Sequence, residues 1–420
     1  MQSVSVEITQ ECKHVESYPH IEMDESYELE VSSSGAFIHA NETWGAMRGM
    51  ETLSQLVYPV HHRQLRINLT RIADNPLFPH RGILLDTARH FISKETIIQL
   101  LESMAMNKMN VFHWHIVDEQ SFPYQSAVFP ALSDRGAYDP VTKIYTASDI
   151  REIIHEARLR GIRVIPEFDT PGHTRSWGLG HPELLTPCYG EIEKDGFYGP
   201  LNPVADSTFS FLEKLFTEVM QVFKDERIHI GGDEVPLRCW ASNPSIQNFT
   251  IKGNITKIKS VYHHFEERYA PYLRIYIACI LSVGGGAIVW EEAFSSGAKL
   301  HEDTIIQLWK GSSLFGTAIA KGYRVLTSSC WYLDHMELDF ASFYRCRELP
   351  YGAFLTMQRL SDQWLGGEAA MWTEHVDEEG LLSRIWPRAS ATAERLWRPV
   401  NQTFYPAGPR MEEQRCRMLR

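Results

Sequence analysis

The sequence predicts an α/β protein, a (β/α)8 TIM barrel preceded by a small α+β domain. Eight short apolar runs recur from about residue 80, and each ends in polar or aromatic residues. Helical patterns lie between several of these runs, and strands that alternate with helices form parallel βαβ units. Eight such units close into a barrel whose functional site is built at the carboxyl ends of the strands.

The eight strand-like runs are separated by segments of different length. They are RGILLDTARH (81–90), NVFHWHIVDE (110–119), RVIPEFDTPGH (163–173), RIHIGGDE (227–234), AIVWEEAF (287–294), TIIQLWKG (304–311), RVLTSSCWYLD (324–334) and WLGGEAAMWTE (364–374). Two connections fit the barrel poorly. Residues 250–286 contain YLRIYIACILSVGGG, and residues 335–363 show no clean helix.

Three connecting segments carry helix signals. Residues 93–109 place apolar side chains at helical spacing after Ser93, which can cap the helix. Residues 146–161 begin with Thr146 and Asp149 in a capping arrangement and end at Gly161. Residues 206–223 form the third pattern. We expect these three helices to cover the outside of the barrel.

The first 75 residues follow a different pattern. SYELEVSSSGAFIHA predicts two short strands with a turn at Ser34-Gly35, and residues 41–57 form an amphipathic helix. We therefore divide the chain into a small α+β domain (1–77), a barrel (78–400) and a C-terminal helical segment (401–420). The first and last of these are expected to be truncated.

The composition is that of an ordinary globular protein, with 44% hydrophobic and 22% charged residues among 420. A net charge of −12 argues against nucleic acid or an anionic membrane as the main partner. No apolar run reaches the roughly 18 residues of a membrane span. The N-terminus has no basic start followed by an apolar core, so no signal peptide is visible.

Sequons and cysteines nevertheless favour a secretory route. Five Asn-x-Thr sequons occur, and we expect glycosylation at Asn41, Asn68, Asn248, Asn254 and Asn401. The seven cysteines show no CxxC spacing, which argues against a zinc ribbon and is compatible with one or two disulfides. We therefore expect a lysosomal or secreted protein whose leader is not part of this chain.

Acids, histidines and tryptophans gather at the predicted strand ends. The set includes Asp86, Asp118, Glu167, Asp169, Asp233, Glu234, Glu291, Glu292, Asp334 and Glu374, with His113, His115 and His173, and with Trp290, Trp309, Trp331, Tyr332 and Trp372. Carboxylates in a pocket walled by tryptophans suit a sugar, whose CH faces stack on rings while its hydroxyls bond to acids and arginine. Hydrolysis of a glycoside needs a carboxylic acid whose pKa is raised by burial.

Each feature also has a structural interpretation. A single acid at a strand end more often caps a helix or holds a loop than takes part in catalysis, and Asp86, Glu167 and Asp169 suit such roles. A single tryptophan in a barrel is usually part of the core. The functional interpretation gains from the ensemble, because all eight strands deliver polar or aromatic groups to one end.

Two other functions stay open at this point. His113 and His115 lie on one strand face and, with His173 and an aspartate, could hold a metal in a metal-dependent barrel hydrolase. Buried histidines with satisfied hydrogen bonds are the more common case. A sugar-binding protein on an inactive barrel is the other alternative.

The longest motifs carry a specific resemblance. RGILLDTARH, NVFHWHIVDEQSFPYQS, RLRGIRVIPEFDTPGHT, HIGGDEV, AAMWTEHVD and IWPRASATAERLW resemble the lysosomal β-hexosaminidases of animals, which belong to glycoside hydrolase family 20. The resemblance covers roughly residues 40–250 and 287–400. It implies the same fold and an exo-acting, retaining hydrolase that removes terminal β-linked N-acetylglucosamine or N-acetylgalactosamine. It implies a homodimer and neither a metal nor a cofactor.

The resemblance also implies the roles of individual residues. In this family the 2-acetamido oxygen of the substrate attacks C1 and forms an oxazolinium ion, so the enzyme supplies no carboxylate nucleophile. Glu234 in GGDE would be the general acid and then the base, Asp233 would orient the acetamido group, and Tyr332 in WYLD would hold its oxygen. The other implied sugar contacts are Arg89, Asp118, His173, Trp290, Trp309, Asp334, Trp372 and Glu374.

Two further positions follow from the same resemblance. Cys188 and Cys239 match a disulfide beside GGDE. Asp334 resembles the β-type subunit, which favours neutral sugars, whereas the α-type has Asn followed by Arg and accepts negatively charged ones. His335 matches neither pattern, so selectivity stays open. A chitinase-type barrel also uses substrate assistance, but the fourth strand lacks a DxxDxDxE run.

Overall fold

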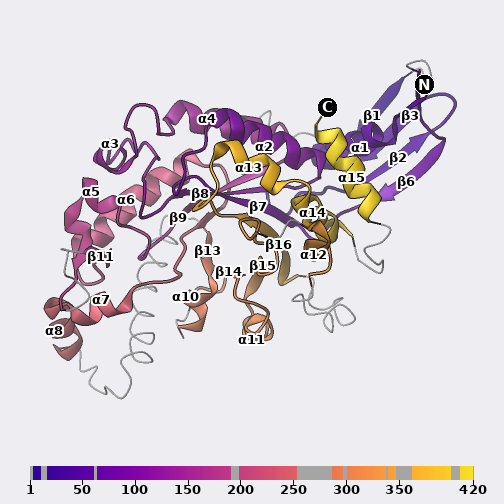
Figure 1. Ribbon diagram of the computed structural model, residues 1–420. Coiled ribbons are helices and arrows are strands. Elements are labelled where there is room, and N and C mark those ends of the chain that lie inside the picture. The colour runs from indigo at the N-terminus through magenta and orange to yellow at the C-terminus, as the bar shows by residue number, and fades with distance from the viewer. Residues whose placement is uncertain are drawn as a thin grey trace.

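Eight parallel strands close into a barrel in the computed structural model of the chain (Figure 1). The strands are β7 (His80–Asp86), β8 (Val111–Val117), β9 (Arg163–Phe168), β12 (Arg227–His229), β13 (Gly286–Trp290), β14 (Ile305–Leu308), β15 (Arg324–Thr327) and β16 (Trp364–Met371). The structure describes residues 3–10, 17–60, 64–190, 198–252, 286–296, 300–336, 339–346, 362–398 and 407–419. The predicted (β/α)8 barrel is confirmed.

The barrel strands are buried on both faces. Every residue of β7, β8, β9 and β16 is buried, because one face lines the barrel and helices cover the other. The fourth strand is shorter than the run at 227–234 suggests. β12 ends at His229, so Asp233 and Glu234 lie in the loop that follows it.

Local capping explains why the predicted helices form where they do. α2 (Lys94–Met106) begins after Ser93, whose hydroxyl accepts the backbone N–H of Thr96. α4 (Ala147–Arg158) begins with a complete capping box between Thr146 and Asp149. α6 (Asp206–Val222) is the third predicted helix. All three are confirmed to within three residues at each end.

Shorter elements fill the other connections. They are α3 (Ala131–Gly136), α5 (Trp177–Gly180), β10 (Leu185–Pro187), β11 (Tyr198–Leu201), α7 (Leu237–Ser242), α8 (Pro244–Lys252), α10 (Glu291–Ser295), α11 (Phe315–Ala320), α12 (Phe340–Tyr344), α13 (Glu378–Ile385) and α14 (Arg388–Trp397). Of the two connections that fit the barrel poorly, residues 253–285 and 347–361 lie outside the described residues. None of the helices in the described residues is long and apolar enough to cross a bilayer.

The N-terminal domain is a four-stranded sheet covered by one helix. The strand order is β1 (Val4–Ile8), β3 (Ala36–Ala40), β2 (Tyr27–Val31), β6 (Thr70–Asp74), and α1 (Thr43–Leu56) packs on one face. The sequence predicted only β2 and β3, which alternate between buried and exposed residues. β1 is exposed throughout, so it lacks the alternation that marks a half-buried strand. A hairpin of β4 (Tyr58–Val60) and β5 (Gln64–Arg66) follows α1.

A buried ionic cluster joins this domain to the barrel. The carboxylate of Glu25 accepts hydrogen bonds from Arg48 (2.8 Å), Arg81 (2.6 Å) and Asn110 (3.0 Å). Arg48 also donates to the carbonyl of Gly161. Arg81, Asn110 and Gly161 lie at or just before the amino ends of β7, β8 and β9. The small domain therefore covers the end of the barrel opposite to the strand ends that carry the acids.

The last helix closes the same end. α15 (Gly408–Met418) lies between α1 and the barrel helices (Figure 1). Arg417 pairs with Glu51 of α1 at 3.1 Å, and Gln414 donates to the carbonyl of Met106 at the end of α2. The predicted C-terminal helical segment thus contacts both domains.

Candidate active site

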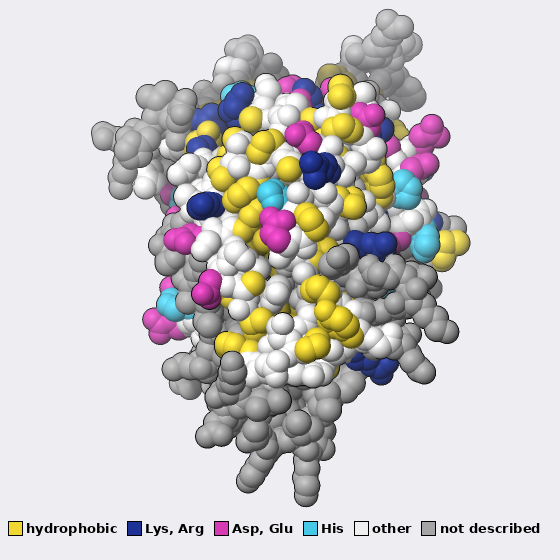
Figure 2. Space-filling model, turned by 90° about the vertical axis from the view of Figure 1, so that its left-hand side faces the viewer, with side chains coloured by type: hydrophobic (Ala, Val, Ile, Leu, Met, Phe, Trp, Pro, Cys, Tyr) yellow, Lys and Arg dark blue, Asp and Glu magenta, His cyan; other side chains and the backbone are white. Residues whose placement is uncertain are grey.

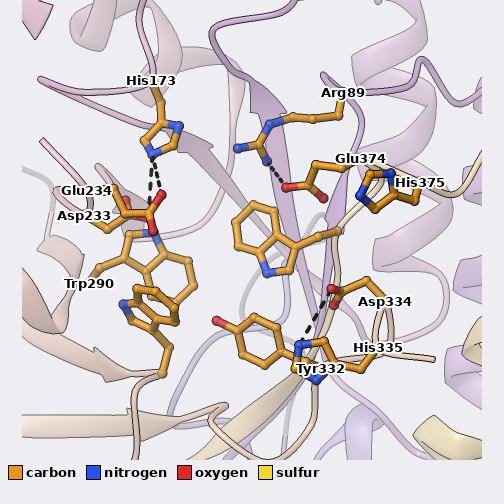
Figure 3. A pocket seen from close by; sticks show the side chains of 12 residues that line it. Arg89, His173, Asp233, Glu234, Trp290, Tyr332, Asp334, His335, Glu374 and His375 are labelled. Carbon is orange, nitrogen blue, oxygen red and sulfur yellow. Dashed lines mark ion pairs between the residues drawn. The ribbon is translucent and has the colours of Figure 1, made fainter. Parts of the chain in front are cut away.

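A pocket of about 360 Å³ lies at the carboxyl ends of the barrel strands (Figure 3). Its walls come from the loops after β7, β9, β12, β14, β15 and β16, together with the last residue of β13. It is lined by Arg89, His173, Asp233, Glu234, Trp290, Trp309, Tyr332, Asp334, His335, Trp372, Glu374 and His375.

The pocket gathers every predicted sugar-contacting residue except Asp118. That carboxylate lies behind the wall, where it pairs with Arg89 at 2.9 Å and accepts from His173 Nδ1 at 3.2 Å. Sequence reasoning missed His375, although it directly follows Glu374 in the MWTEH motif. His335 also lines the pocket, next to the Asp334 side chain.

Asp233 and Glu234 lie on one side of the pocket, beside His173 (Figure 3). Their carboxylates are 3.9 and 3.8 Å from His173 Nε2. The loop that carries them has positive φ at Gly231 (68°), Gly232 (102°) and Glu234 (45°). A side chain at Gly231 would clash with the carboxylate of Asp169, so only glycine fits there. The loop conformation, and not the alternation of a strand, directs the two acids.

The exposure of the two acids differs. The side chain of Asp233 is 13% exposed, whereas that of Glu234 is 59% exposed. The sequence suggested a carboxylic acid whose pKa is raised by burial, and the exposed side chain of Glu234 does not match that expectation. The positive φ angles of the glycine loop accompany this exposed position of Glu234.

His173 places a positive charge beside the acidic pair. Burial opposes the charged imidazole, but the hydrogen bond to Asp118 and the charges of Asp118 and Asp233 raise the pKa of His173 to about 9. His173 also has a positive φ of 55°, a backbone conformation that costs free energy and that clusters at functional sites.

Arg89 is held rigidly at the other side of the pocket. Its guanidinium contacts Asp86 at 3.1 Å, Asp118 at 2.9 Å and Glu374 at 3.6 Å, and it lies over the ring of Trp372. Burial works against the cation, but these carboxylates raise the pKa of Arg89 above its usual range. A fixed guanidinium next to a carboxylate can bind two neighbouring hydroxyl groups of a sugar.

Aromatic rings form the rest of the wall. Trp290 and Trp372 lie 6.2 Å apart between ring centres, and Trp309 lies 6.3 Å from Tyr332. Trp309 donates its indole N–H to Glu292 at 3.0 Å. Burial and the nearby charge of Asp233 raise the pKa of Tyr332, so its phenol stays protonated and can donate a hydrogen bond. Burial also raises the pKa of Asp334.

The histidines proposed as metal ligands are engaged with carboxylates instead. Both ring nitrogens of His115 contact acids, Glu167 at 2.7 Å and Asp118 at 2.7 Å. His113 lies between Glu368 (2.8 Å) and Glu167 (2.9 Å) in the same way. Among the described residues, none of the groups of three close histidine and acid ligands contains both His113 and His173. The ligand set that the metal hypothesis requires is therefore not assembled.

Two disulfides support the loops around the pocket. One joins Cys188 to Cys239, the pairing that the resemblance implied. The other joins Cys330, two residues before Tyr332, to Cys346 after α12. The sequence offered no signal for this second pairing. Among the described cysteines, Cys416 is free and exposed.

The barrel, the acidic pair and the tryptophan-walled pocket define a glycoside hydrolase. Comparison with known families narrows this class. The family described as glycosyl hydrolase family 20, catalytic domain, matches residues 78–400, and a second, described as beta-acetyl hexosaminidase like, matches residues 1–56. The chain belongs to glycosyl hydrolase family 20.

Curated relatives and solved structures agree with this assignment. The beta-hexosaminidase subunit beta of Felis catus is 45% identical over 99% of this chain and 77% of its own length. The subunit alpha of Rattus norvegicus is 43% identical over 98% of this chain and 78% of its own length. The structure of a Flavobacterium johnsoniae chitobiase superposes with a TM-score of 0.86 at 31% identity, covering 99% of this chain and 62% of that one.

Proposed function

We propose that this chain is an exo-acting β-N-acetylhexosaminidase that cleaves terminal β-linked N-acetylglucosamine or N-acetylgalactosamine from glycoconjugates with retention. One observation carries the proposal. Asp233 and Glu234 are consecutive residues on one side of a pocket walled by Trp290, Trp309, Tyr332 and Trp372 (Figure 3). Such a pair serves two neighbouring atoms of one sugar better than it serves opposite faces of a glycosidic bond.

The pocket suggests how the terminal sugar binds. Arg89 and Glu374 would bind the C3 and C4 hydroxyls, while the sugar ring stacks on Trp372. The acetamido group would lie against Trp290 and Trp309. Tyr332, protonated because its pKa is raised, would donate to the acetamido oxygen, and Asp233 would accept the acetamido N–H.

The first chemical step breaks the glycosidic bond. Glu234 would protonate the leaving oxygen while the acetamido oxygen attacks C1, giving an oxazolinium ion and the free leaving group. Asp233 would stabilise the positive charge that develops on the acetamido group. The internal nucleophile is held next to C1 by the substrate itself, which gives it a high effective concentration.

In the second chemical step Glu234 acts as a general base instead of a general acid. Glu234, now a carboxylate, would take a proton from water, whose oxygen attacks C1 and opens the oxazolinium ring. The product keeps the β configuration, because C1 is inverted twice. The exposure of Glu234 at the mouth of the pocket suits this cycle, since the leaving group departs and water enters there.

Hydrolysis of an aryl N-acetyl-β-glucosaminide by the purified chain tests the proposal. We expect turnover that N-acetylglucosamine inhibits competitively. If the folded chain neither hydrolyses this substrate nor binds the sugar, the proposed function is wrong. If it binds the sugar without hydrolysis, the chain is the inactive sugar-binding protein that the sequence left open.

The cellular location and the oligomeric state of the enzyme can also be proposed. We infer a lysosomal or secreted glycoprotein, because Asn41, Asn68 and Asn248 are exposed; Asn254 and Asn401 lie outside the described residues. We further propose a homodimer, since the curated relatives are named as subunits. Mass measurement before and after glycan removal, combined with light scattering, would test both points.

The net charge of −12 argues against nucleic acid as a partner, and one face of the molecule agrees with this. The face shown in Figure 2, on the side of α3, α5 and α7, mixes acidic, basic, histidine and hydrophobic side chains across its described part. A nucleic acid would need a continuous basic stripe. A small, uncharged sugar needs only the pocket.

A further inference from the structure

The side chains inside the barrel are apolar near the amino ends of the strands and polar closer to the pocket. At its amino end an aliphatic layer fills it, formed by Val111, Ile165, Ile288, Ile305, Leu326 and Leu365. Residues two positions apart on a strand share a face. Two residues further along β8, β9 and β14, the residues are His113, Glu167 and Gln307, all fully buried. A buried polar layer therefore separates the apolar base from the pocket.

Glu167 is the centre of this layer. In the strand register it pairs with His115 of β8 and His229 of β12. Its Oε2 accepts from His115 Nδ1 at 2.7 Å and pairs with His113 at 2.9 Å. Its Oε1 accepts the indole N–H of Trp290 at 2.8 Å. One buried carboxylate thus contacts both a residue of the pocket wall and a histidine that leads to the sugar-binding arginine.

The route to the arginine runs through His115 and Asp118. Carboxylates only accept hydrogen bonds, so His115, which lies between two of them, carries a proton on both ring nitrogens. Burial opposes this charge, but Glu167 and Asp118 raise the pKa of His115 to about 10. Asp118 in turn pairs with Arg89 at 2.9 Å and accepts from His173 at 3.2 Å.

We propose that Glu167 is a positioning residue for hydrolysis: it fixes the indole of Trp290 and holds His115 as the cation that keeps Asp118 ionised behind Arg89. The inference rests on the proposed function, because it concerns the same pocket. A carboxylate that merely satisfied buried donors would contribute to stability, but it would leave the pH dependence of catalysis unchanged.

Several other charged groups face Glu167. They are His113 on β8, His229 on β12 and Asp169 beyond the end of β9. Burial lowers the pKa of His229, and burial with the charges of Asp233 and Glu167 raises that of Asp169. Both shifts favour the neutral form of the group. The negative charge that His113 and His115 share is that of Glu167.

Glu167→Gln tests the proposal, with Glu368→Gln as the matched control. Glu368 is equally buried and pairs with His113 and His80, but it contacts none of the pocket residues through a hydrogen bond or ion pair described here. In Glu167→Gln the amide N–H2 faces His115, which gives up its proton. Asp118 then loses a neighbouring cation, and its pKa rises.

The measurement is the pH dependence of kcat/KM for the aryl substrate. For Glu167→Gln we expect kcat/KM at the optimum to fall roughly 10- to 100-fold and the acid limb to move to higher pH. For Glu368→Gln we expect the acid limb of the wild type. If both variants keep the wild-type limb, or both shift it equally, Glu167 is not a positioning residue.

A second variant covers the case in which Glu167→Gln does not fold. Trp290→Phe keeps an aromatic ring but removes the N–H that Glu167 accepts, and we expect the KM of the aryl substrate to rise at least tenfold. An unchanged KM would overturn the inference. An inactive wild-type chain would instead contradict the proposed function, so the two failures can be told apart.

Discussion

The acids of the pocket and the acids of the barrel interior are the same residue types in opposite environments. Asp233 and Glu234 lie on a glycine loop, and Glu234 is mostly exposed. Glu167 and Glu368 lie on strands, are fully buried and have histidine donors within 3 Å. An acid that exchanges protons with a substrate has to reach it, whereas an acid that orients other groups has to be held. Exposure and partners, and not residue type, separate the two roles.

The largest expected effect is the loss of catalysis without loss of stability at the pocket acids. In the proposed mechanism, Glu234→Gln removes the proton donor, and Asp233→Asn removes the charge that stabilises the acetamido group. We expect kcat for the aryl substrate to fall about 10²- to 10⁴-fold in both variants. Thermal denaturation should show a midpoint close to that of the wild type.

Glu213→Gln is the matched control for this prediction. Glu213 is an exposed acid on the outer helix α6 and does not line the pocket. Its replacement should leave both kcat and the denaturation midpoint unchanged. Wild-type kcat in Glu234→Gln would contradict the proposed role of Glu234.

Replacing Glu25 is expected to have the opposite effect: the protein becomes less stable, but kcat does not change. This buried acid pairs with Arg48 and Arg81 at the closed end of the barrel, and the two arginines hold the pKa of Glu25 below its usual value against the effect of burial. Glu25→Gln leaves two buried cations without their counter-ion, which typically costs about 3–5 kcal/mol. Urea denaturation should show this loss, while kcat per folded molecule stays that of the wild type. A tenfold lower kcat would show that the closed end influences the pocket.

The buried histidines predict how the stability of the wild-type chain depends on pH. The pKa values of His113, His115 and His173 are raised to about 9, 10 and 9, above about 6.5 in the unfolded chain. Their stabilisation is complete below pH 6.5 and is lost as the pH rises toward 9–10. Each retained proton contributes about 1.4 kcal/mol per pH unit over this range.

Below about pH 6.5 the stability of the fold is expected to decrease as the pH falls. Burial lowers the pKa of His80 and His229, so these two histidines reduce the stability of the fold as the pH falls below about 6.5. The lowered pKa values of Glu25, Asp118 and Glu368 add a further loss below about pH 4.3. Thermal denaturation from pH 4 to 10 should therefore show maximal stability near pH 6.5. A maximum above pH 8 would contradict the charged state of His113 and His115.

The smallest expected effect is that of a chelator. The ring nitrogens of His113 and His115 that a metal would need are occupied by Glu167, Asp118 and Glu368. Dialysis against EDTA should therefore leave kcat/KM for the aryl substrate within twofold of its starting value. Activity that is lost in EDTA and returns with added zinc would support the metal-dependent hydrolase instead.

The sequence predicted what short-range chemistry determines. Thr146 and Asp149 are three residues apart, so their capping box could be seen in the sequence. The barrel followed from the repetition of apolar runs, and the pocket from the rule that strand ends meet at one edge. GGDE, WYLD and MWTE placed the acids, the tyrosine and the tryptophan through the family resemblance.

Long-range pairings and loop conformations could not be predicted in this way. His113 meets Glu368 across 255 residues, and Cys330 meets Cys346 only because the chain folds α12 back onto the loop after β15. The outward direction of Glu234 depends on three positive φ angles after β12, where a continued strand was expected. Long-range pairings and loop φ angles can be seen only in the three-dimensional structure.

Two matched aryl glycosides test most directly whether the nucleophile belongs to the substrate. One carries the 2-acetamido group, and the other is its deacetylated 2-amino counterpart. Because the amine has no internal oxygen to attack C1, we predict that the wild-type chain cleaves it at least about 10³-fold less efficiently in kcat/KM. Cleavage of the amine within tenfold of the acetamide would mean that a carboxylate across the pocket attacks C1, and it would contradict substrate-assisted hydrolysis.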